Sequence, residues 1–345
     1  MSFRCAVRSL TLWGLLLLLL LAPAAGLAGV RDGLACCAGQ LIPALFPFFV
    51  VTELLLSDPA GRWAGLLLFP LTRAAGIRDR HAPAVLFLGW LGGFAVAARC
   101  VSQQYERGSL SRSQAEWLLL AAAGSSPAFV VNAVGLTMLR SRAAGVLLML
   151  SLLAANLSTA LLCRPLLHFE AVPSAPPEAP SPGGLVPAVR SAVDAALTVC
   201  GFVVFFRFLL AVLGEVLPLT GAGRFLLGAV LEVSAGCAAG AALPRYGLYA
   251  CCAALSVQGL SVLLQLRALT SRALRLCPLV LSRLLHLPLS LCFLRLGLQF
   301  APLTAPVWSS LSGRVLTRSR APADAAFWLF VLCCVVLHRL HPHQA

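Results

Sequence analysis

The sequence predicts an all-α, polytopic membrane protein. Three observations support this fold class: 60% of the 345 residues are hydrophobic, only 11% are charged, and the mean hydropathy of the chain is +0.91. Soluble domains are about half apolar and about a quarter charged, so water cannot be the main solvent of this chain. The lipid bilayer is therefore its first expected partner, and the cell membrane its expected location. Transport, sensing, lipid chemistry and scaffolding remain as classes of function.

A helical span needs roughly 20 apolar residues, so the chain has room for about eight to ten spans or broken half-spans. The first element is expected over residues 1–30, where Arg4 and Arg8 precede an apolar run that continues to Val30. A cleaved signal peptide and an uncleaved membrane anchor both begin this way. We expect a signal-like helix that remains as an anchor, because further spans follow it.

The next apolar segment, residues 33–56, contains Pro43 and Pro47. Each proline removes a backbone donor, and its ring clashes with the preceding turn. We therefore expect that this segment does not form one straight, regular helix. Further apolar segments are expected at about 63–71, 83–98, 115–139, 143–163, 193–217, 225–243, 246–266, 276–298 and 325–337.

The chain contains two stretches that share one order of features, residues 121–158 and residues 252–290. Each has a polar break in an apolar run, then about a dozen apolar residues, an arginine-bearing turn and a long span. Upstream, residues 51–71 and 210–230 resemble each other in the same order. Internal repeats of this kind occur in secondary transporters, whose binding sites lie where the repeats meet.

A segment rich in Pro, Ala, Ser and Gly separates the two halves, and this composition favours an extended linker outside the bilayer. The expected organisation is an anchor, two repeats joined by this linker, and a loop with a C-terminal membrane helix and a His-bearing tail. The bounds are 1–30 for the anchor, 31–168 for the first repeat, 169–188 for the linker, 189–303 for the second repeat and 304–345 for the rest.

Two polar breaks interrupt corresponding apolar segments of the halves: residues 124–127, which read Gly-Ser-Ser-Pro, and residues 256–261. An interrupted helix leaves backbone N–H and C=O groups unpaired, and these groups can bind a small solute or an ion. Small residues also allow close helix packing, which is the alternative explanation. We expect both breaks to be non-helical and to lie near each other at mid-membrane. The candidate solute contacts are Ser125, Ser126, Asn132, Gln258 and Ser261, with Gln258 foremost because its amide offers two donors and an acceptor.

The other polar residues in apolar segments are explained without a functional site. Glu53, Glu215, Glu232 and Asp194 lie near the predicted ends of spans, so we expect them at the membrane interface. His286 lies within a long apolar segment, and a helix–helix hydrogen bond explains it better than a proton relay.

The charged residues and the Cys and His patterns of the sequence argue against several kinds of enzyme chemistry. The formal charge of +14 comes from arginine alone, since the chain has no lysine, and this excludes a P-loop lysine and a Schiff base. The arginines are scattered, as in loops that flank a membrane, so we expect no nucleic-acid partner. No C-x-x-C, H-E-x-x-H or nucleophile-elbow pattern occurs, and the terminal histidines look incidental. We therefore expect no enzyme activity, no metal and no cofactor.

One apolar segment carries a recognisable motif. Residues 41–55, LIPALFPFFVVTELL, closely resemble the P-S-L-F-P-F-F-V-x-S-E-L-L signature of YlbJ-like sporulation integral membrane proteins. Those proteins contain a nucleoside-recognition or Gate region that also occurs in concentrative nucleoside transporters and in an iron transporter. The stretches 93–99, 106–112, 125–135 and 259–262 are similar to further motifs of the family. The chain departs from the family at Ala95, Ala97 and Arg99, where proline, glycine and lysine are usual.

The resemblance covers roughly residues 30 to 300 and implies two Gate-like repeats with broken, re-entrant helices. Together with the paired breaks, it indicates that the protein transports or recognises a small polar solute such as a nucleoside. The alternative is a non-transporting partner that helps to assemble a spore-envelope or membrane complex, with a second membrane protein or another copy of this chain. A polar cavity would favour the first function, and a dry core packed with Ser and Gly would favour the second.

Overall fold

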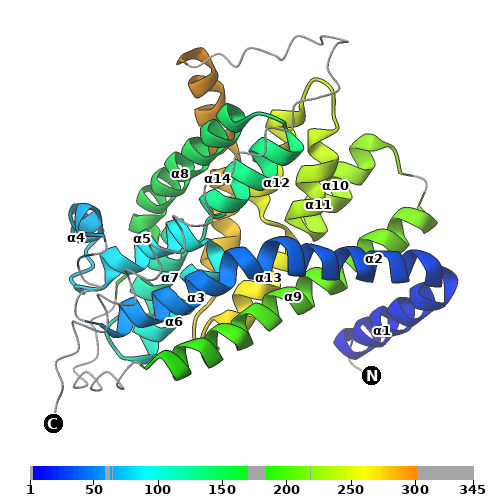
Figure 1. Cartoon of the computed structure of the whole chain (residues 1–345). Helices are drawn as coiled ribbons and strands as arrows, with labels where there is room; N and C mark the ends of the chain where they lie inside the picture. The colour runs from blue at the N-terminus through cyan, green and yellow to red at the C-terminus, as the bar shows by residue number, and fades with distance from the viewer. Residues whose placement is uncertain (1–2, 59–62, 64, 170–183, 218, 301–345) are drawn as a thin grey trace, which may run out of the picture. The chain divides into compact units, whose positions relative to one another are not determined.

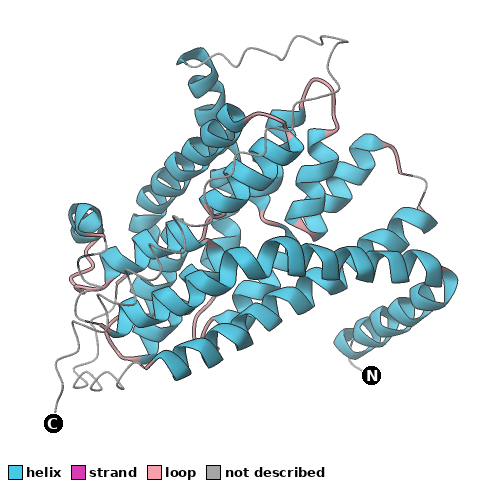
Figure 2. Ribbon diagram, in the orientation of Figure 1, coloured by secondary structure: helices cyan, strands magenta, loops and turns pink. Residues whose placement is uncertain are grey.

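The computed structural model describes residues 3–58, 63, 65–169, 184–217 and 219–300, and within these ranges all regular structure is helical (Figures 1 and 2). Four helical segments there are long and apolar enough to cross a membrane, or five if one sharply bent pair counts as a single span. The protein is thus an all-α, multi-pass membrane protein, which confirms the predicted fold class. The segments are Arg142–Leu166, Leu185–Val216, Gly247–Leu269 and Cys277–Phe300.

The helices follow one another with short connections. In chain order they are α1 (Phe3–Leu21), α2 (Pro23–Cys36), the π-helical η1 (Cys37–Leu41), α3 (Ile42–Ser57), η3 (Leu66–Leu68), α4 (Phe69–Ala74), α5 (Ala82–Gly92), α6 (Phe94–Glu106), α7 (Arg112–Ala122), the π-helical η4 (Ala128–Met138), α8 (Arg142–Cys163), η5 (Arg164–Leu166), α9 (Leu185–Val216), α10 (Gly221–Leu231), α11 (Val233–Ala241), α12 (Gly247–Val257), α13 (Gly259–Leu269) and α14 (Cys277–Phe300).

The N-terminal segment is not one helix over residues 1–30. It divides at Ala22, where α1 ends and α2 begins, and the bend between the apolar part of α1 and the following helix is 100°. Pro23 explains the division, because proline fits the first turn of a helix and moves the residue before it out of the helical conformation. Ala22 accordingly has φ −138° and ψ 62°.

The proline-containing segment confirms the expected irregularity but remains helical. A π-helical turn, η1, lies between α2 and α3, and the N–H of Ile42 bonds to the carbonyl of Cys37 instead of the carbonyl four residues back. Pro43 then lies in the first turn of α3, where no N–H donor is needed. Pro47 lies inside α3. The π-helical turn thus allows the chain to remain helical although the segment contains two prolines.

Two predictions concern segments at the edge of the described structure. Of the expected linker, residues 170–183 lie outside the described residues, while residues from Leu185 onward already form the first turn of α9. Pro187 does not prevent this, because proline is tolerated in a first turn. The expected loop and helix at 304–345 lie outside the described residues as well.

The order of elements is the same in both halves. A long helix, two interrupted helix pairs and a second long helix follow one another: α3, α5/α6, α7/η4 and α8 first, then α9, α10/α11, α12/α13 and α14. This order agrees with the two expected repeats, whose relationship stays a prediction.

Helix α9 runs antiparallel to the α2–η1–α3 segment, and Figure 1 shows the two side by side. Gly26 faces Phe208 near one end of α9, Gly33 faces Val204 further along, and Glu53 lies beside Ser191 at the other end. Helices α5, α6, α10 and α13 pack on this long helix pair, while α7 and η4 pack on α5, α6, α8 and α11.

Candidate functional site

Four helix breaks define the candidate site, one in each interrupted pair. Gly93 separates α5 from α6, residues 123–126 separate α7 from η4, Glu232 separates α10 from α11, and Gln258 separates α12 from α13. The breaks have distinct backbone geometry. Gly93 and Gln258 have positive φ values of 86° and 70°, which glycine adopts freely and glutamine rarely.

The four breaks contact one another. The side-chain Nε2 of Gln258 donates to the carbonyl of Ala123 at 2.8 Å, which joins the two breaks that the sequence predicts. A Cβ atom on Gly93 would lie 3.1 Å from the backbone nitrogen of Ser126, and one on Gly259 would lie 3.2 Å from the carbonyl oxygen of Ala229. The predicted proximity of the two breaks is therefore confirmed, and their depth in the membrane stays a prediction.

The bounds of the two predicted breaks differ from the expectation. The first runs from Ala123 to Ser126, and Pro127 already belongs to the following helix. The second is a single residue, Gln258, while Ser256 and Ser261 lie in the flanking helices. One residue suffices there because the left-handed conformation of Gln258 alone redirects the chain.

A cavity of about 380 Å³ lies where the breaks meet. Apolar residues of η1, α3, α9, η4 and α13 form much of its wall. A solute-sized, mostly apolar cavity with a few placed polar groups is the usual form of a small-molecule site. The polar side chains on its wall include Ser125, Ser126, Asn132, Glu232, Ser234 and Gln265.

Three of the five predicted contacts line this cavity. Ser125 and Ser126 project from the first break, and the Oγ of Ser126 also accepts a hydrogen bond from the N–H of Phe129 at 3.3 Å. Asn132 lines the cavity from an exposed position on η4.

The other two predicted contacts lie behind the cavity wall. Gln258 is only 2% exposed, and its amide bridges two breaks through the Ala123 carbonyl. Ser261 is fully buried, and its Oγ accepts a hydrogen bond from Nε2 of Gln265 at 3.0 Å. Their roles as solute contacts stay predictions, while these bonds show that both residues connect elements of the site.

Gln265 is a cavity residue that the sequence interpretation missed. Its side chain is 2% exposed and lines the cavity, and its Oε1 has no hydrogen-bond partner. Because Nε2 is held by Ser261, the free oxygen is an acceptor for a bound molecule. The spacing of four residues from Ser261, which places both side chains on one helix face, is the signal that could have found it.

Glu232 is the second cavity residue that the sequence interpretation missed, while its expected depth at the membrane interface stays a prediction. The side chain is 3% exposed and lines the cavity. Its carboxylate accepts hydrogen bonds from the N–H groups of Ser234 and Ala235, at 2.9 and 2.8 Å, and so caps α11. A carboxylate at a helix N-terminus is favourable because it meets unpaired N–H groups and the positive end of the helix dipole.

Glu232 also belongs to an ion-pair cluster around Arg207 of α9. Nε of Arg207 lies 3.3 Å from Oε2 of Glu232, and its NH2 donates to Oγ of Ser234 at 2.6 Å. The NH1 group of Arg207 pairs with Asp32 of α2. The cluster therefore connects a cavity wall with two long helices.

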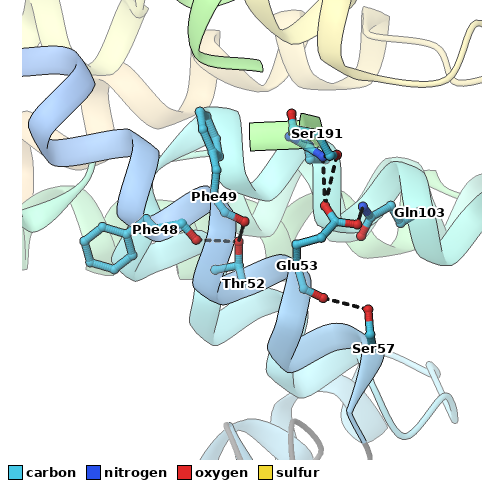
Figure 3. Close-up of polar contacts among 8 residues, drawn as sticks. Phe48, Phe49, Thr52, Glu53, Ser57, Gln103 and Ser191 are labelled. Atoms are coloured by element: carbon cyan, nitrogen blue, oxygen red, sulfur yellow. Dashed lines mark hydrogen bonds and ion pairs between the residues drawn. The ribbon is translucent and has the colours of Figure 1, made fainter. Parts of the chain in front are cut away.

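A second cluster, which does not line the cavity, surrounds Glu53 of α3 (Figure 3). Oε2 of Glu53 lies 2.8 Å from NH2 of Arg99, and Oε1 accepts from Nε2 of Gln103 at 2.6 Å. NH1 of Arg99 donates to the Ser191 carbonyl at 2.6 Å. This cluster joins α3, α6 and α9.

Away from both clusters, His286 of α14 shares a hydrogen bond with Ser256 of α12, which is the helix–helix contact that the sequence predicts.

The chain is similar to a known membrane protein. The chain is 28% identical over 142 residues to the sporulation integral membrane protein YlbJ of Bacillus subtilis (strain 168), over 41% of this chain and 35% of that protein. The matched region thus spans about a third of the relative's length. No family model matches the chain. No solved structure matches it. The protein is an integral membrane protein similar to a sporulation membrane protein.

Proposed function

We propose that the protein binds a small polar solute in the cavity between the four helix breaks and passes it across the membrane. The observation that carries this proposal is that three of the four breaks line one cavity of about 380 Å³, while the fourth, Gln258, is joined to the break at Ala123 behind its wall. Interrupted helices in an apolar environment are tolerated where protein or a water-filled cavity covers the unpaired backbone groups. In secondary transporters such breaks provide the backbone groups that hold solutes and ions.

The polar groups of the cavity indicate the kind of solute. Gln265 offers an unpaired acceptor, and Ser125 and Ser126 offer hydroxyl groups. The surrounding wall includes apolar side chains such as Phe129 and Val262. A solute with hydrogen-bond donors on one part and an apolar face on another fits this combination. A nucleoside, which the resemblance to Gate-type proteins implies, has both features.

The physiological setting follows from the relative. Because YlbJ is named as a sporulation integral membrane protein, we propose that this protein also acts in spore formation. We propose transport as its role there: the hydroxyl–carboxylate pair on the cavity wall, Ser234 with Glu232 at 2.6 Å, is engaged by Arg207 and by the N-terminus of α11.

The test is uptake by the purified protein in proteoliposomes, with a panel of labelled nucleosides, amino acids and polyols. The informative variant is Gln265→Leu, which removes the free acceptor while it keeps a similar volume. Loss of one hydrogen bond in a buried site costs about 1–3 kcal/mol, so we expect about ten- to a hundredfold weaker uptake affinity. Gln104→Leu is the matched control, because Gln104 is a buried glutamine outside the cavity wall.

The second candidate function is that of a non-transporting assembly partner. Close glycine contacts support it: a Cβ on Gly135 would lie 2.4 Å from the Cα of Gly145, and one on Gly228 would lie 2.8 Å from the nitrogen of Gly236. Small residues at such contacts serve packing. No uptake of any panel member, together with co-purification of a stable membrane complex, would favour this function over transport.

A further inference from the structure

A second pocket lies at the ends of α6 and α13, apart from the cavity at the helix breaks, and has a volume of about 930 Å³. Eight of its ten lining residues are polar or charged, although 60% of the chain is hydrophobic. Three of the eight are arginines, Arg99, Arg267 and Arg272, while Glu106 is the one carboxylate among these described residues. The wall of this pocket therefore carries an excess of positive charge.

The pocket lies at a surface of the membrane. Residues 270–276 connect the candidate spans Gly247–Leu269 and Cys277–Phe300. A loop between two spans lies outside the hydrocarbon region, because lipid cannot satisfy its backbone groups. Three residues of this loop, 270–272, line the pocket. Phosphate groups occur at this level of the membrane, both in phospholipid headgroups and in dissolved anions.

The pocket and the cavity follow one another along the same two helices. On α6, Ala95 lines the cavity and Arg99 lines the pocket. On α13, Gln265 lines the cavity and Ala268 lines the pocket. A helix rises by about 1.5 Å per residue, so these steps are about 6 and about 4.5 Å long. The pocket thus lies next to the cavity, between it and the membrane surface.

Hydrogen bonds hold the wall of the pocket in place before any ligand binds. The N–H of Ser271 donates to Oγ of Ser102 at 2.7 Å, which connects the loop to α6. NH1 of Arg267 donates to the carbonyl of Leu274 at 2.8 Å, within the same loop. A site that is ordered in advance loses less conformational entropy when a ligand binds.

The charges of the pocket are incompletely paired. Arg99 pairs with Glu53, so its charge is balanced within the protein. Arg267 and Arg272 form no ion pair with the described residues, and the guanidinium of Arg272 makes no hydrogen bond with them either. Glu106 on the same wall balances only one of these two charges.

The end of helix α13 explains one of the two arginines. Arg267 lies in the last turn of α13, where positive charge is favourable because it meets the negative end of the helix dipole. Arg272 lies in the loop, three residues beyond the end of α13, and is exposed. The helix dipole acts only within the last turn, so Arg272 needs another partner.

A phosphate group matches the free donors of the pocket. The planar guanidinium of arginine presents paired N–H groups that bind two oxygens of one phosphate. Arg267 and Arg272 supply two such groups, and the hydroxyl of Ser271, on the same wall, has no hydrogen-bond partner among the described residues. A phosphate has three free acceptor oxygens and close to two negative charges, so one phosphate group engages all three side chains and neutralises both arginines.

We propose that this pocket binds a phosphate group, with Arg267 and Arg272 as its main contacts and Ser271 as a further donor. The phosphate group belongs to a dissolved anion or to a phospholipid headgroup, and the chemistry of recognition is the same for both. The inference goes beyond the proposed function, since the pocket is separate from the cavity. Its test measures phosphate binding and no uptake, so the phosphate site and the transport function stand or fall separately.

The experiment measures equilibrium binding of radiolabelled inorganic phosphate to the full-length protein in micelles of a maltoside detergent, which contains no phosphate. The variants are Arg272→Gln and Arg267→Gln. Arg245→Gln is the matched control, because Arg245, like Arg272, is an exposed arginine between two helices, and it lines neither the pocket nor the cavity. Thermal unfolding of each variant shows whether the protein remains folded.

A competition arm identifies the source of the phosphate group. Phosphatidylglycerol is added to the micelles, and diacylglycerol, which lacks the phosphate, is its control. Displacement of the labelled phosphate by phosphatidylglycerol, at a lower concentration than by unlabelled phosphate, assigns the pocket to a lipid headgroup. Displacement by unlabelled phosphate alone assigns it to a dissolved anion. Both results support the proposal.

We expect saturable phosphate binding by the parent and at least about tenfold weaker binding by Arg272→Gln and Arg267→Gln, since each loses charge-assisted hydrogen bonds. Arg245→Gln should stay within about twofold of the parent. Absence of saturable binding overturns the proposal, as does an equal loss in Arg245→Gln or an unchanged affinity in Arg272→Gln. If Arg267→Gln unfolds because its bond to Leu274 is lost, Arg272→Gln decides.

Discussion

The breaks of the first half and those of the second half are built from different residues. Gly93 and the stretch with Ser125 and Ser126 provide backbone groups and short hydroxyl side chains on the cavity wall. Glu232 and Gln258 provide long polar side chains that bond to other elements of the site. The difference indicates that the breaks of the first half leave their polar groups available to a solute, while the breaks of the second half use their polar side chains to hold the site together.

Gln258 shows how this division works. The break after α7 leaves carbonyl groups without helical partners, and the side chain of Gln258 satisfies the carbonyl of Ala123. The amide that the sequence suggests as the foremost solute contact is thus engaged within the protein. Gln265, one helix further on, offers the free acceptor.

The largest effect is expected from Glu232→Ala. The substitution removes the cap of α11 and leaves the partly buried Arg207 with Asp32 as its remaining carboxylate. Uncapping costs about 1 kcal/mol, and breaking a buried ion pair costs about 3–5 kcal/mol, reduced here because Asp32 remains. We expect a loss of about 3 kcal/mol in the free energy of unfolding, measured by denaturation in detergent micelles. A loss below about 1 kcal/mol would contradict a bracing role for the second-half breaks.

Gln258→Leu is expected to cost about 2 kcal/mol of stability. The substitution leaves the buried Ala123 carbonyl unpaired and keeps a non-glycine residue at φ 70°. The matched variant Gln258→Gly removes the hydrogen bond but tolerates the positive φ, so it should lose less stability than Gln258→Leu. Thermal unfolding curves of both variants separate the two causes. Equal stability of Gln258→Leu and the parent would show that the bridge between the breaks is unimportant.

Gly93→Ala, a change in a break of the first half, should lower the free energy of unfolding by about 1–2 kcal/mol. The added Cβ would lie 3.1 Å from the nitrogen of Ser126 at a backbone φ of 86°. The strain should also displace the first break and weaken solute uptake. Gly14→Ala is the control, since a Cβ there has no atom within 4 Å and the substitution favours the helix. Unfolding and uptake are measured on the same preparations.

Ser125→Ala should have the smallest effect on stability, within about 0.5 kcal/mol, because it removes one hydroxyl from a cavity wall. If the first half presents its groups to a solute, the same change should weaken uptake by about three- to tenfold, the value of one hydrogen bond. The comparison of Ser125→Ala with Gln258→Leu is therefore decisive: affinity falls in the first and stability in the second. The reverse pattern would overturn the division between the halves.

The sequence by itself determined the fold class, the positions of the two main breaks and their approach to each other. The hydropathy of a segment indicates whether it lies in lipid or in water, and Gly, Ser and Pro within an apolar run interrupt a helix locally. Both features can therefore be recognised from the sequence without knowledge of the tertiary contacts. Only the tertiary structure decided which polar side chains face the cavity. A helix turns by about 100° per residue, so the break at Gln258 decides which face of α13 turns toward the cavity, and Gln265 on that face reaches the wall while Ser261, one turn nearer the break, supports it from behind. The burial of Glu232 is also a tertiary effect, because α9 brings Arg207 beside its carboxylate.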